Sequence, residues 1–133
     1  MALYLLDTNI VSSLLKYPRG LVAQSIEAVG ESAIATSIIV AAELRFGAVK
    51  RQSPLLTTQV EAIPAALTIL PLQPPADIHY GSIRTALEQA GKMIGGNDLL
   101  IAAQAIALSR VLVTANTVEF TSVSGLKVEN WLV

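Results

Sequence analysis

The chain has 133 residues, a formal net charge of −1, 14% charged residues and 53% hydrophobic residues. This length predicts a single domain, residues 1–133, that buries roughly two-thirds of the surface of the unfolded chain. The sequence has no cysteine and one histidine, His79, which excludes a disulfide framework, a thiolate nucleophile and a zinc site built from cysteines or clustered histidines. Any metal must therefore be held by oxygen ligands.

The longest nearly apolar stretch, residues 99–113, contains Gln104, Ser109 and Arg110. It is shorter than the ~20 residues that a membrane span needs, and it is interpreted as a buried helix followed by a strand. Asp7 lies too early for a cleavable signal peptide, and no basic segment precedes a long apolar one. These features predict a cytoplasmic protein without a membrane segment, and the low charged fraction indicates apolar surface that a partner covers.

In chain order, the first half of the sequence alternates strands and helices. Residues 3–6 are apolar without polar alternation, which is typical of a strand buried on both faces. Pro18 and Gly20 separate the first two helices, Ser37 is a predicted N-cap, and Ser53-Pro54 ends the next helix. The predicted elements are strands at 3–6 and 33–36 and helices at 10–16, 21–29, 38–51 and 55–63.

The second half continues the same alternation. A helix over 76–90 carries Ile78, Ile83 and Leu87 on its inner side and stops at Gly91. The other predicted elements are a strand at 68–70, a stiff connector at 71–75, a loop at 92–97, a helix at 98–109, a strand at 111–114, a turn at 116–120 and a closing strand at 126–132. This alternation predicts an α/β fold, a layered parallel sheet with right-handed crossovers and helices on both faces.

The first strand ends on a charge, Asp7. Ligands of open α/β sheets bind outside the carboxyl ends of the strands, so Asp7 lies where chemistry is usually done. The alternative is that Asp7, or its neighbours Thr8 and Asn9, simply cap the following helix, which stabilises a helix by ~1 kcal/mol. Both interpretations are open for Asp7.

Three further acidic residues are candidates for the same site. Glu43 has only Ile39, Val40, Phe46 and Gly47 as helical neighbours, so its carboxylate needs a partner from elsewhere in the fold. Asp98 either joins a site or caps the apolar helix that follows it, a role that Asn97 fills equally well.

Glu119 and Asn116 follow the strand at 111–114, where a solvated charge and a turn residue are the alternatives to site roles.

If Asp7, Glu43 and Asp98 converge, their repulsion must be balanced. Two like charges ~4 Å apart cost about 4 kcal/mol at an effective dielectric constant of 20, so the three carboxylates need a proton or a cation. Oxygen ligands without histidine or cysteine favour Mg²⁺, with Mn²⁺ as an alternative, and the chemistry that suits such an ion is phosphodiester hydrolysis.

Four blocks of the sequence, in order and spread over nearly the whole chain, resemble the PIN-domain ribonucleases and, more narrowly, the VapC toxins of bacterial type II toxin–antitoxin systems. The blocks are Leu5-Leu6-Asp7-Thr8-Asn9, then Thr36-Ser37 through Ala42-Glu43-Leu44 to Gly47, then Ile94-Gly95-Gly96-Asn97-Asp98 with Leu100-Ile101-Ala102-Ala103, and finally Val113-Thr114-Ala115-Asn116 through Phe120, Gly125-Leu126 and Trp131.

The resemblance implies a three-layer α/β/α fold with a mainly parallel central sheet, and an endoribonuclease that cuts RNA with a Mg²⁺-activated water. It implies that Asp7, Glu43 and Asp98 bind the metal and that Glu119 completes or adjoins the catalytic pocket. Thr8, Ser37 and Asn116 are the implied accessory residues. The implied partners are the RNA substrate, a VapB-like antitoxin and a second copy of the chain in a homodimer.

The sequence departs from the family at one position of the pocket. Many PIN domains have an aspartate where Asn116 stands, which weakens a second metal site unless Glu119 substitutes. Arg45, Arg84 and Lys92 are candidate contacts to RNA phosphates, with solvated surface charge as the alternative and Glu88 as another partner for Arg84. Lys50 and Arg51 are further candidates for these contacts, and solvated surface charge is the favoured interpretation for both.

Two rival functions are weaker. A Mg²⁺-dependent phosphatase of the haloacid dehalogenase type needs a second aspartate two residues after the first, where this chain has Asn9. A non-catalytic PIN-like module would bind RNA or protein without cutting, and the intact set of Asp7, Glu43 and Asp98 argues against it.

Overall fold

The protein folds around a five-stranded parallel sheet. In the structure, a computed structural model that describes residues 2–133, the strand order is β3-β2-β1-β4-β5, and all four pairings are parallel. The prediction of a parallel α/β sheet is therefore confirmed. The strands are β1 (Tyr4–Leu6), β2 (Ile34–Ser37), β3 (Thr68–Leu70), β4 (Val111–Val113) and β5 (Val128–Glu129).

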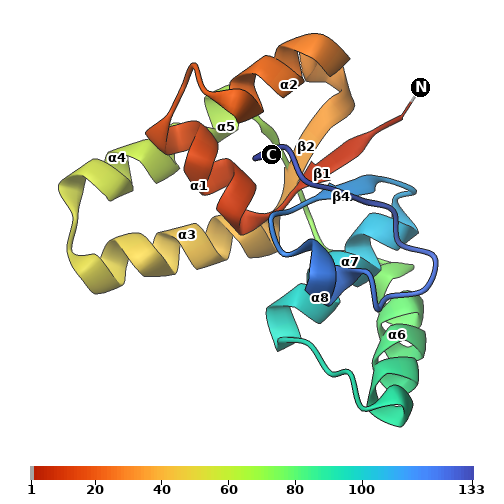
Figure 1. The fold of residues 1–133 in the computed structure, drawn as a ribbon. Helices are drawn as coiled ribbons and strands as arrows, with labels where there is room; N and C mark the ends of the chain where they lie inside the picture. Colours follow the sequence, from red (N-terminus) through yellow and green to blue (C-terminus); the bar gives the residue numbers. More distant parts are fainter. Residues whose placement is uncertain (1) are drawn as a thin grey trace.

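Helices cover both faces of this sheet and make a three-layer α/β/α arrangement (Figure 1). The helices α3 and α4 extend away from the sheet together, whereas α6, α7 and α8 gather on its other side (Figure 1). The helices are α1 (Thr8–Lys16), α2 (Leu21–Val29), α3 (Ile38–Arg51), α4 (Pro54–Glu61), α5 (Ile63–Ala66), α6 (Ala76–Ala90), α7 (Gly96–Ala107) and α8 (Thr117–Phe120), with a 3₁₀ turn at Glu31–Ala33.

Helix ends lie where the capping residues of the sequence predict them. Ser37 accepts a hydrogen bond from the Ile39 N–H and begins α3, and Ser53 does the same for Leu56 in α4, which has Pro54 in its first turn. Gly91 has a φ of 67°, a left-handed conformation that glycine adopts without strain, and it ends α6.

Several predicted boundaries are wrong. The helix predicted at 55–63 is split into α4 and α5, with Pro64 in the first turn of α5, where proline is tolerated. The helix predicted from Asp98 begins at Gly96 and is preceded by Gly95 as N-cap, so neither Asn97 nor Asp98 caps it. The turn predicted at 116–120 is the short helix α8.

Two predictions about packing are also wrong. The closing strand predicted at 126–132 has only two residues, Val128 and Glu129, which pair with Leu112 and Val113 of β4. Ile78 is 66% exposed, whereas Ile83 and Leu87 are buried as predicted. Each residue of an α-helix turns the chain by about 100°. Ile78, five residues before Ile83, therefore lies about 140° away around the axis of α6 and on a different face.

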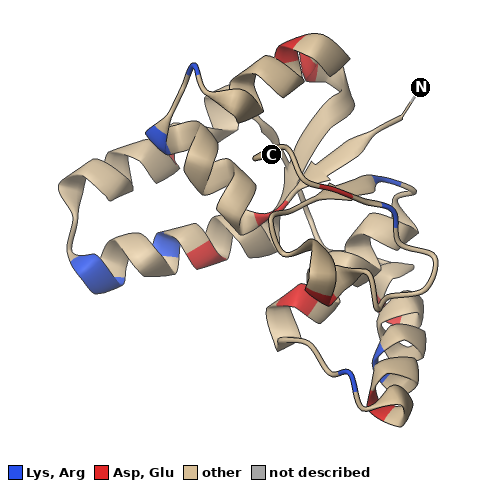
Figure 2. Ribbon diagram, viewed as in Figure 1, with Lys and Arg blue, Asp and Glu red and all other residues tan. Residues whose placement is uncertain are grey.

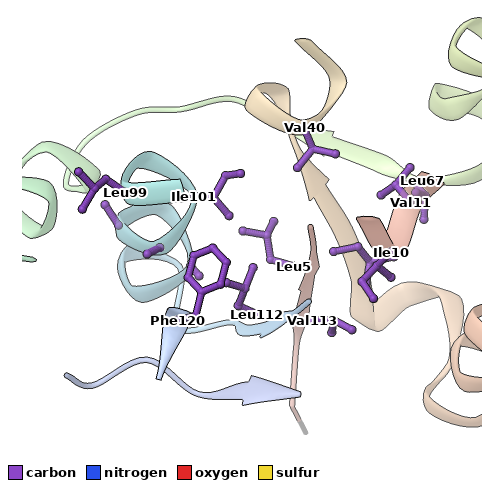
Figure 3. Packing of buried hydrophobic residues seen from close by; sticks show 14 of the residues in the cluster. Leu5, Ile10, Val11, Val40, Leu67, Leu99, Ile101, Leu112, Val113 and Phe120 are labelled. Atoms are coloured by element: carbon purple, nitrogen blue, oxygen red, sulfur yellow. The ribbon is translucent and has the colours of Figure 1, made fainter. Parts of the chain in front are cut away.

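The core is continuous across the sheet (Figure 3). Leu5 and Leu6, successive residues of β1, are both fully buried, as predicted for a strand covered on two faces. Phe120 is fully buried, and the Trp131 ring lies 5.1 Å from the Tyr4 ring, centroid to centroid. Within residues 2–133, the helices are all too short or too polar to cross a bilayer.

Candidate active site

Asp7 lies at the carboxyl end of the central strand. Its N–H donates to the Val113 carbonyl at 2.9 Å, which continues the β1–β4 pairing by one residue. The side chain is 2% exposed, and both of its oxygens accept hydrogen bonds: Oδ1 from the Thr8 N–H at 2.8 Å and Oδ2 from the Thr114 hydroxyl at 2.7 Å. The carboxylate is therefore held in one orientation.

The two interpretations of Asp7 are not exclusive. Asp7 is the N-cap of α1, so the prediction that Thr8 or Asn9 caps this helix instead is wrong. Burial raises the pKa of Asp7, the bonds from Thr114 and Thr8 lower it, and the nearby charge of Glu119 raises it. A carboxylate used only as a cap would stand in water, whereas this one is buried beside another acid.

Thr114 and Asn9 hold this end of the sheet together, and sequence reasoning assigned them no role in the site. Thr114 is fully buried, and its hydroxyl accepts from the Asn116 N–H at 3.1 Å while it donates to Asp7. Asn9 Oδ1 accepts from the Ala115 N–H at 2.9 Å. A polar residue directly after the strand beside β1 is the signal that points to Thr114.

Glu43 reaches the site from the first half of α3. Its Oε1 accepts a hydrogen bond from the Thr8 hydroxyl at 2.9 Å. The partner that Glu43 lacks in its own helix thus comes from α1, although the side chain is half-buried rather than enclosed. Thr8 contacts Asp7 through its backbone and Glu43 through its side chain, so it links the two acids.

Asp98 and Glu119 form the other side of the site. Asp98 lies in the first turn of α7 and Glu119 in α8, and both are half-buried. Burial, the charges of Glu119, Asp7 and Glu43, and a hydrogen bond with Glu119 raise the pKa of Asp98 to about 7. Glu119 is therefore not a solvated turn charge but a near neighbour of Asp98.

The carboxylates of Asp7, Glu43, Asp98 and Glu119 thus meet at one end of the sheet, and Figure 2 shows acidic segments where β1 ends and on α3, α7 and α8. The salt bridges within residues 2–133 join Arg45 to Glu61 and Arg84 to Glu88, away from these acids. Glu88 is therefore the partner of Arg84, as one of the alternatives to a phosphate contact predicted. Lys92 is exposed.

The donor set fits a hard divalent cation, because it consists of carboxylates. Burial and then the repulsion of neighbouring acids raise the pKa of Asp98, and a cation would favour its ionised form against both. As the side chains lie, however, no three His, Cys, Asp or Glu residues among residues 2–133 form a group that holds an ion. Binding therefore requires the carboxylates to draw closer together.

The remaining predicted accessory residues lie around this cluster with different environments. Ser37 is fully buried, and its hydroxyl oxygen caps α3. Asn116 is exposed, precedes α8 without capping it through its side chain, and uses its backbone N–H to contact Thr114.

Comparison with known proteins gives one consistent result. The PIN domain model matches residues 4–126. Among curated relatives, Ribonuclease VapC2 of Haemophilus influenzae is 39% identical over 99% of this chain and 100% of its own, and Ribonuclease VapC2 of Rickettsia felis is 38% identical over 97% and 98%. The tRNA(fMet)-specific endonuclease VapC of Shigella flexneri is 32% identical over 98% and 99%.

Solved structures agree with these relatives. VapBC2 from Rickettsia felis, bound to a DNA fragment from its promoter, contains a chain with a TM-score of 0.89 and 36% identity, covering 97% of this chain and 98% of that one. VapBC-1 from nontypeable Haemophilus influenzae contains one with a TM-score of 0.87 and 30% identity, covering 98% and 99%. Family match, identity and fold coincide over nearly the full length, and this chain belongs to the PIN domain family, in its VapC branch.

Proposed function

We propose that this chain is an endoribonuclease toxin that hydrolyses RNA phosphodiester bonds with Mg²⁺, or Mn²⁺ in its place. The observation that carries the proposal is the meeting of four carboxylates from separate elements, with the pKa of Asp98 raised to about 7. The names of the relatives, ribonuclease and tRNA(fMet)-specific endonuclease, support RNA as the substrate. The chain offers no cysteine as an alternative nucleophile.

Asp7, Glu43 and Asp98 are the proposed metal ligands, and Glu119 adjoins them. Asp7 presents a fixed carboxylate because Thr114 and Thr8 hold both of its oxygens. With its pKa raised to about 7, Asp98 would give up its proton on binding a cation, since the attraction of the cation would outweigh the repulsion of the neighbouring acids. When bound, the ion activates a water molecule and neutralises negative charge on the phosphate.

The test is a cleavage assay on a labelled single-stranded RNA with Mg²⁺ or Mn²⁺. We expect Asp7→Asn and Asp98→Asn to lower the rate by at least about 100-fold, and EDTA to abolish cleavage of the wild-type protein. Asp77→Asn, which changes an exposed aspartate of α6, is the matched control and should keep full activity. Cleavage that persists in both site variants and in EDTA contradicts the proposed mechanism.

A second candidate, a non-catalytic PIN-like binding module, is favoured by one observation. As they lie, the acidic side chains of residues 2–133 do not form a ready metal-binding group. A titration with Mn²⁺ separates the two functions, because the nuclease requires saturable binding that Asp98→Asn weakens. Binding of RNA without saturable Mn²⁺ binding would favour the module.

We further propose a VapB-like antitoxin and a second copy of this chain as protein partners. The solved relatives named VapBC support the first, and exposed apolar side chains such as Phe46 and Val49 on α3 support a covered surface in general. An antitoxin arginine that enters the acidic pocket would inhibit by supplying the missing positive charge. Full inhibition by an antitoxin that lacks this arginine would contradict that mode.

A further inference from the structure

We infer that the groove between α1 and the α3–α4 pair holds a single-stranded RNA, and that Lys16 and Arg51 bind its phosphates a few nucleotides from the bond that is cut. The inference rests on the proposed function. The groove has a volume of about 440 Å³, and its lining includes Glu43, Gly47 and Arg51 from α3, Lys16 from α1 and Leu55 from α4.

The groove has opposite charges at its two ends. Glu43 and Arg51 lie on one stripe of α3, eight residues apart, which separates them by about 12 Å along the helix. Lys16, in the last turn of α1, lines the same groove. Both basic side chains are exposed, and neither forms a salt bridge within residues 2–133. Basic groups at the end of α1 and along α3 appear in Figure 2.

Gly47 keeps the floor of the groove low between these ends. A Cβ atom added at Gly47 would have no heavy atom within 4 Å apart from its two chain neighbours and the backbone of its own helix, so the space above it is open. Glycine inside a helix costs about 1 kcal/mol relative to alanine, and no positive φ explains its presence here. The open floor lies next to Leu55, which is 67% exposed, so this part of the groove is accessible to a ligand.

Charge complementarity favours RNA over a peptide as the occupant. A phosphodiester chain needs cations along its backbone and carboxylates only where a metal meets the bond that is cut. The groove has this order: the acidic cluster begins at Glu43, and Lys16 and Arg51 lie beyond it. Arg45, one of the earlier candidates, is instead paired with Glu61.

The first test compares two double variants with the same change of net charge. Lys16→Gln/Arg51→Gln removes the groove cations, and Arg19→Gln/Lys50→Gln removes two exposed cations that do not line the groove. Binding of a fluorescein-labelled 12-nucleotide single-stranded RNA is measured by anisotropy in Mg²⁺, with Asp98→Asn present in all proteins to prevent cleavage.

We expect about tenfold weaker binding for the groove variant, and a salt dependence of log K that is shallower by about 1.4 because two single-strand phosphate contacts are lost. The control variant should retain the parent slope. Equal slopes for both double variants and the parent would overturn the inference.

The second test fills the groove without changing charge. Gly47→Leu adds a side chain on the floor, whereas Gly81→Leu adds one at an equally open helical position of α6. We expect Gly47→Leu to cut the labelled RNA at least tenfold more slowly and Gly81→Leu to cut at the wild-type rate, with both folded by circular dichroism.

These results separate the two levels of the proposal. If Gly47→Leu and the loss of the groove cations both leave cleavage at the wild-type rate, the nuclease function stands but the groove does not bind RNA. The groove would then be assigned to a protein partner, and the inference would be wrong. Absence of metal-dependent cleavage by the wild-type protein would instead contradict the proposed function itself.

Discussion

At the scale of single residues, the buried carboxylates control the chemistry of the site through the few groups that contact them. Asp7 is 2% exposed and yet accepts two hydrogen bonds, whereas Asp98 is half-buried and is opposed by three other acids. Burial raises the pKa of both carboxyls, but hydrogen bonds oppose it at Asp7, whereas the repulsion of three acids adds to it at Asp98, so substitutions at the two sites have different effects.

Asp98→Asn is expected to stabilise the protein in EDTA. The folded-state pKa of Asp98 is raised from 3.8 to about 7, so its contribution to stability is fully present below pH 3.8 and is lost as the pH rises through about 7. At pH 8 the free energy of unfolding of the variant should exceed that of the wild type by on the order of 1–2 kcal/mol, after allowance for solvent screening. At pH 4 the two should be nearly equal. Urea unfolding from pH 4 to 8 measures this. A gain that is the same at every pH would contradict the electrostatic cause.

Thr114→Val is expected to destabilise the protein by about 1–3 kcal/mol, because the buried Asp7 carboxylate loses a charge-assisted hydrogen bond. The cost should be larger at pH 8 than at pH 4, since the lost bond favours the ionised form of Asp7 and lowers its pKa. Thr36→Val is the matched control, since the equally buried Thr36 hydroxyl donates to the neutral Leu6 carbonyl. Urea unfolding of both variants at the two pH values tests this, and a similar pH response in both would contradict it.

At the scale of elements, the site depends on how accurately helices begin at the carboxyl ends of the strands. Asp7 directly follows β1, and Glu43 lies in the first half of α3. Asp98 lies in the first turn of α7, and Glu119 lies in α8. A cap that fixes where one of these helices starts therefore also fixes where its carboxylate lies.

Ser37→Ala is expected to lower the free energy of unfolding by about 1 kcal/mol, because the start of α3 loses its side-chain acceptor for the Ile39 N–H. The variant should also bind Mn²⁺ more weakly, since α3 carries Glu43. Ser53→Ala removes the corresponding cap from α4 and should cost a similar amount of stability without affecting Mn²⁺ affinity, since α4 contributes no carboxylate to the cluster. Thermal unfolding and isothermal titration with Mn²⁺ measure the two effects. Equal Mn²⁺ affinities in the two variants would show that the cap acts on stability alone.

At the scale of the whole molecule, the cluster joins parts of the chain that are far apart in sequence. Asp7 and Asp98 come from opposite halves of the protein. Thr8 connects α1 with α3, and Thr114, after β4, connects to Asp7, after β1. A cation shared by these groups would cross-link the fold and would oppose unfolding.

Mn²⁺ is therefore expected to raise the melting temperature, by an amount that grows with the logarithm of its concentration once the site is saturated. At 100 times the dissociation constant the gain is about 2.7 kcal/mol. Asp7→Asn and Asp98→Asn should lose most of this shift, and Asp77→Asn should retain it. Differential scanning calorimetry provides the measurement, and an equal shift in all four proteins would indicate binding elsewhere.

Much of the fold was predictable from local sequence. The ends of α2, α3 and α6 agree with prediction because Gly20, Ser37 and Gly91 act on their own neighbours in the chain. The length of β5 was not predictable, since a strand extends only as far as its neighbour pairs with it, and only Leu112 and Val113 of β4 pair with β5.

The sequence by itself determined the kind of site: acidic residues beside apolar elements, no cysteine, and a single histidine leave oxygen chemistry. Only the tertiary structure decided which groups meet, because strand order and helix packing bring Thr114 to Asp7, Thr8 to Glu43 and Glu119 to Asp98. Hydrogen bonding and carboxylate repulsion act over a few ångströms in space, whereas the sequence separates these partners by up to 107 residues.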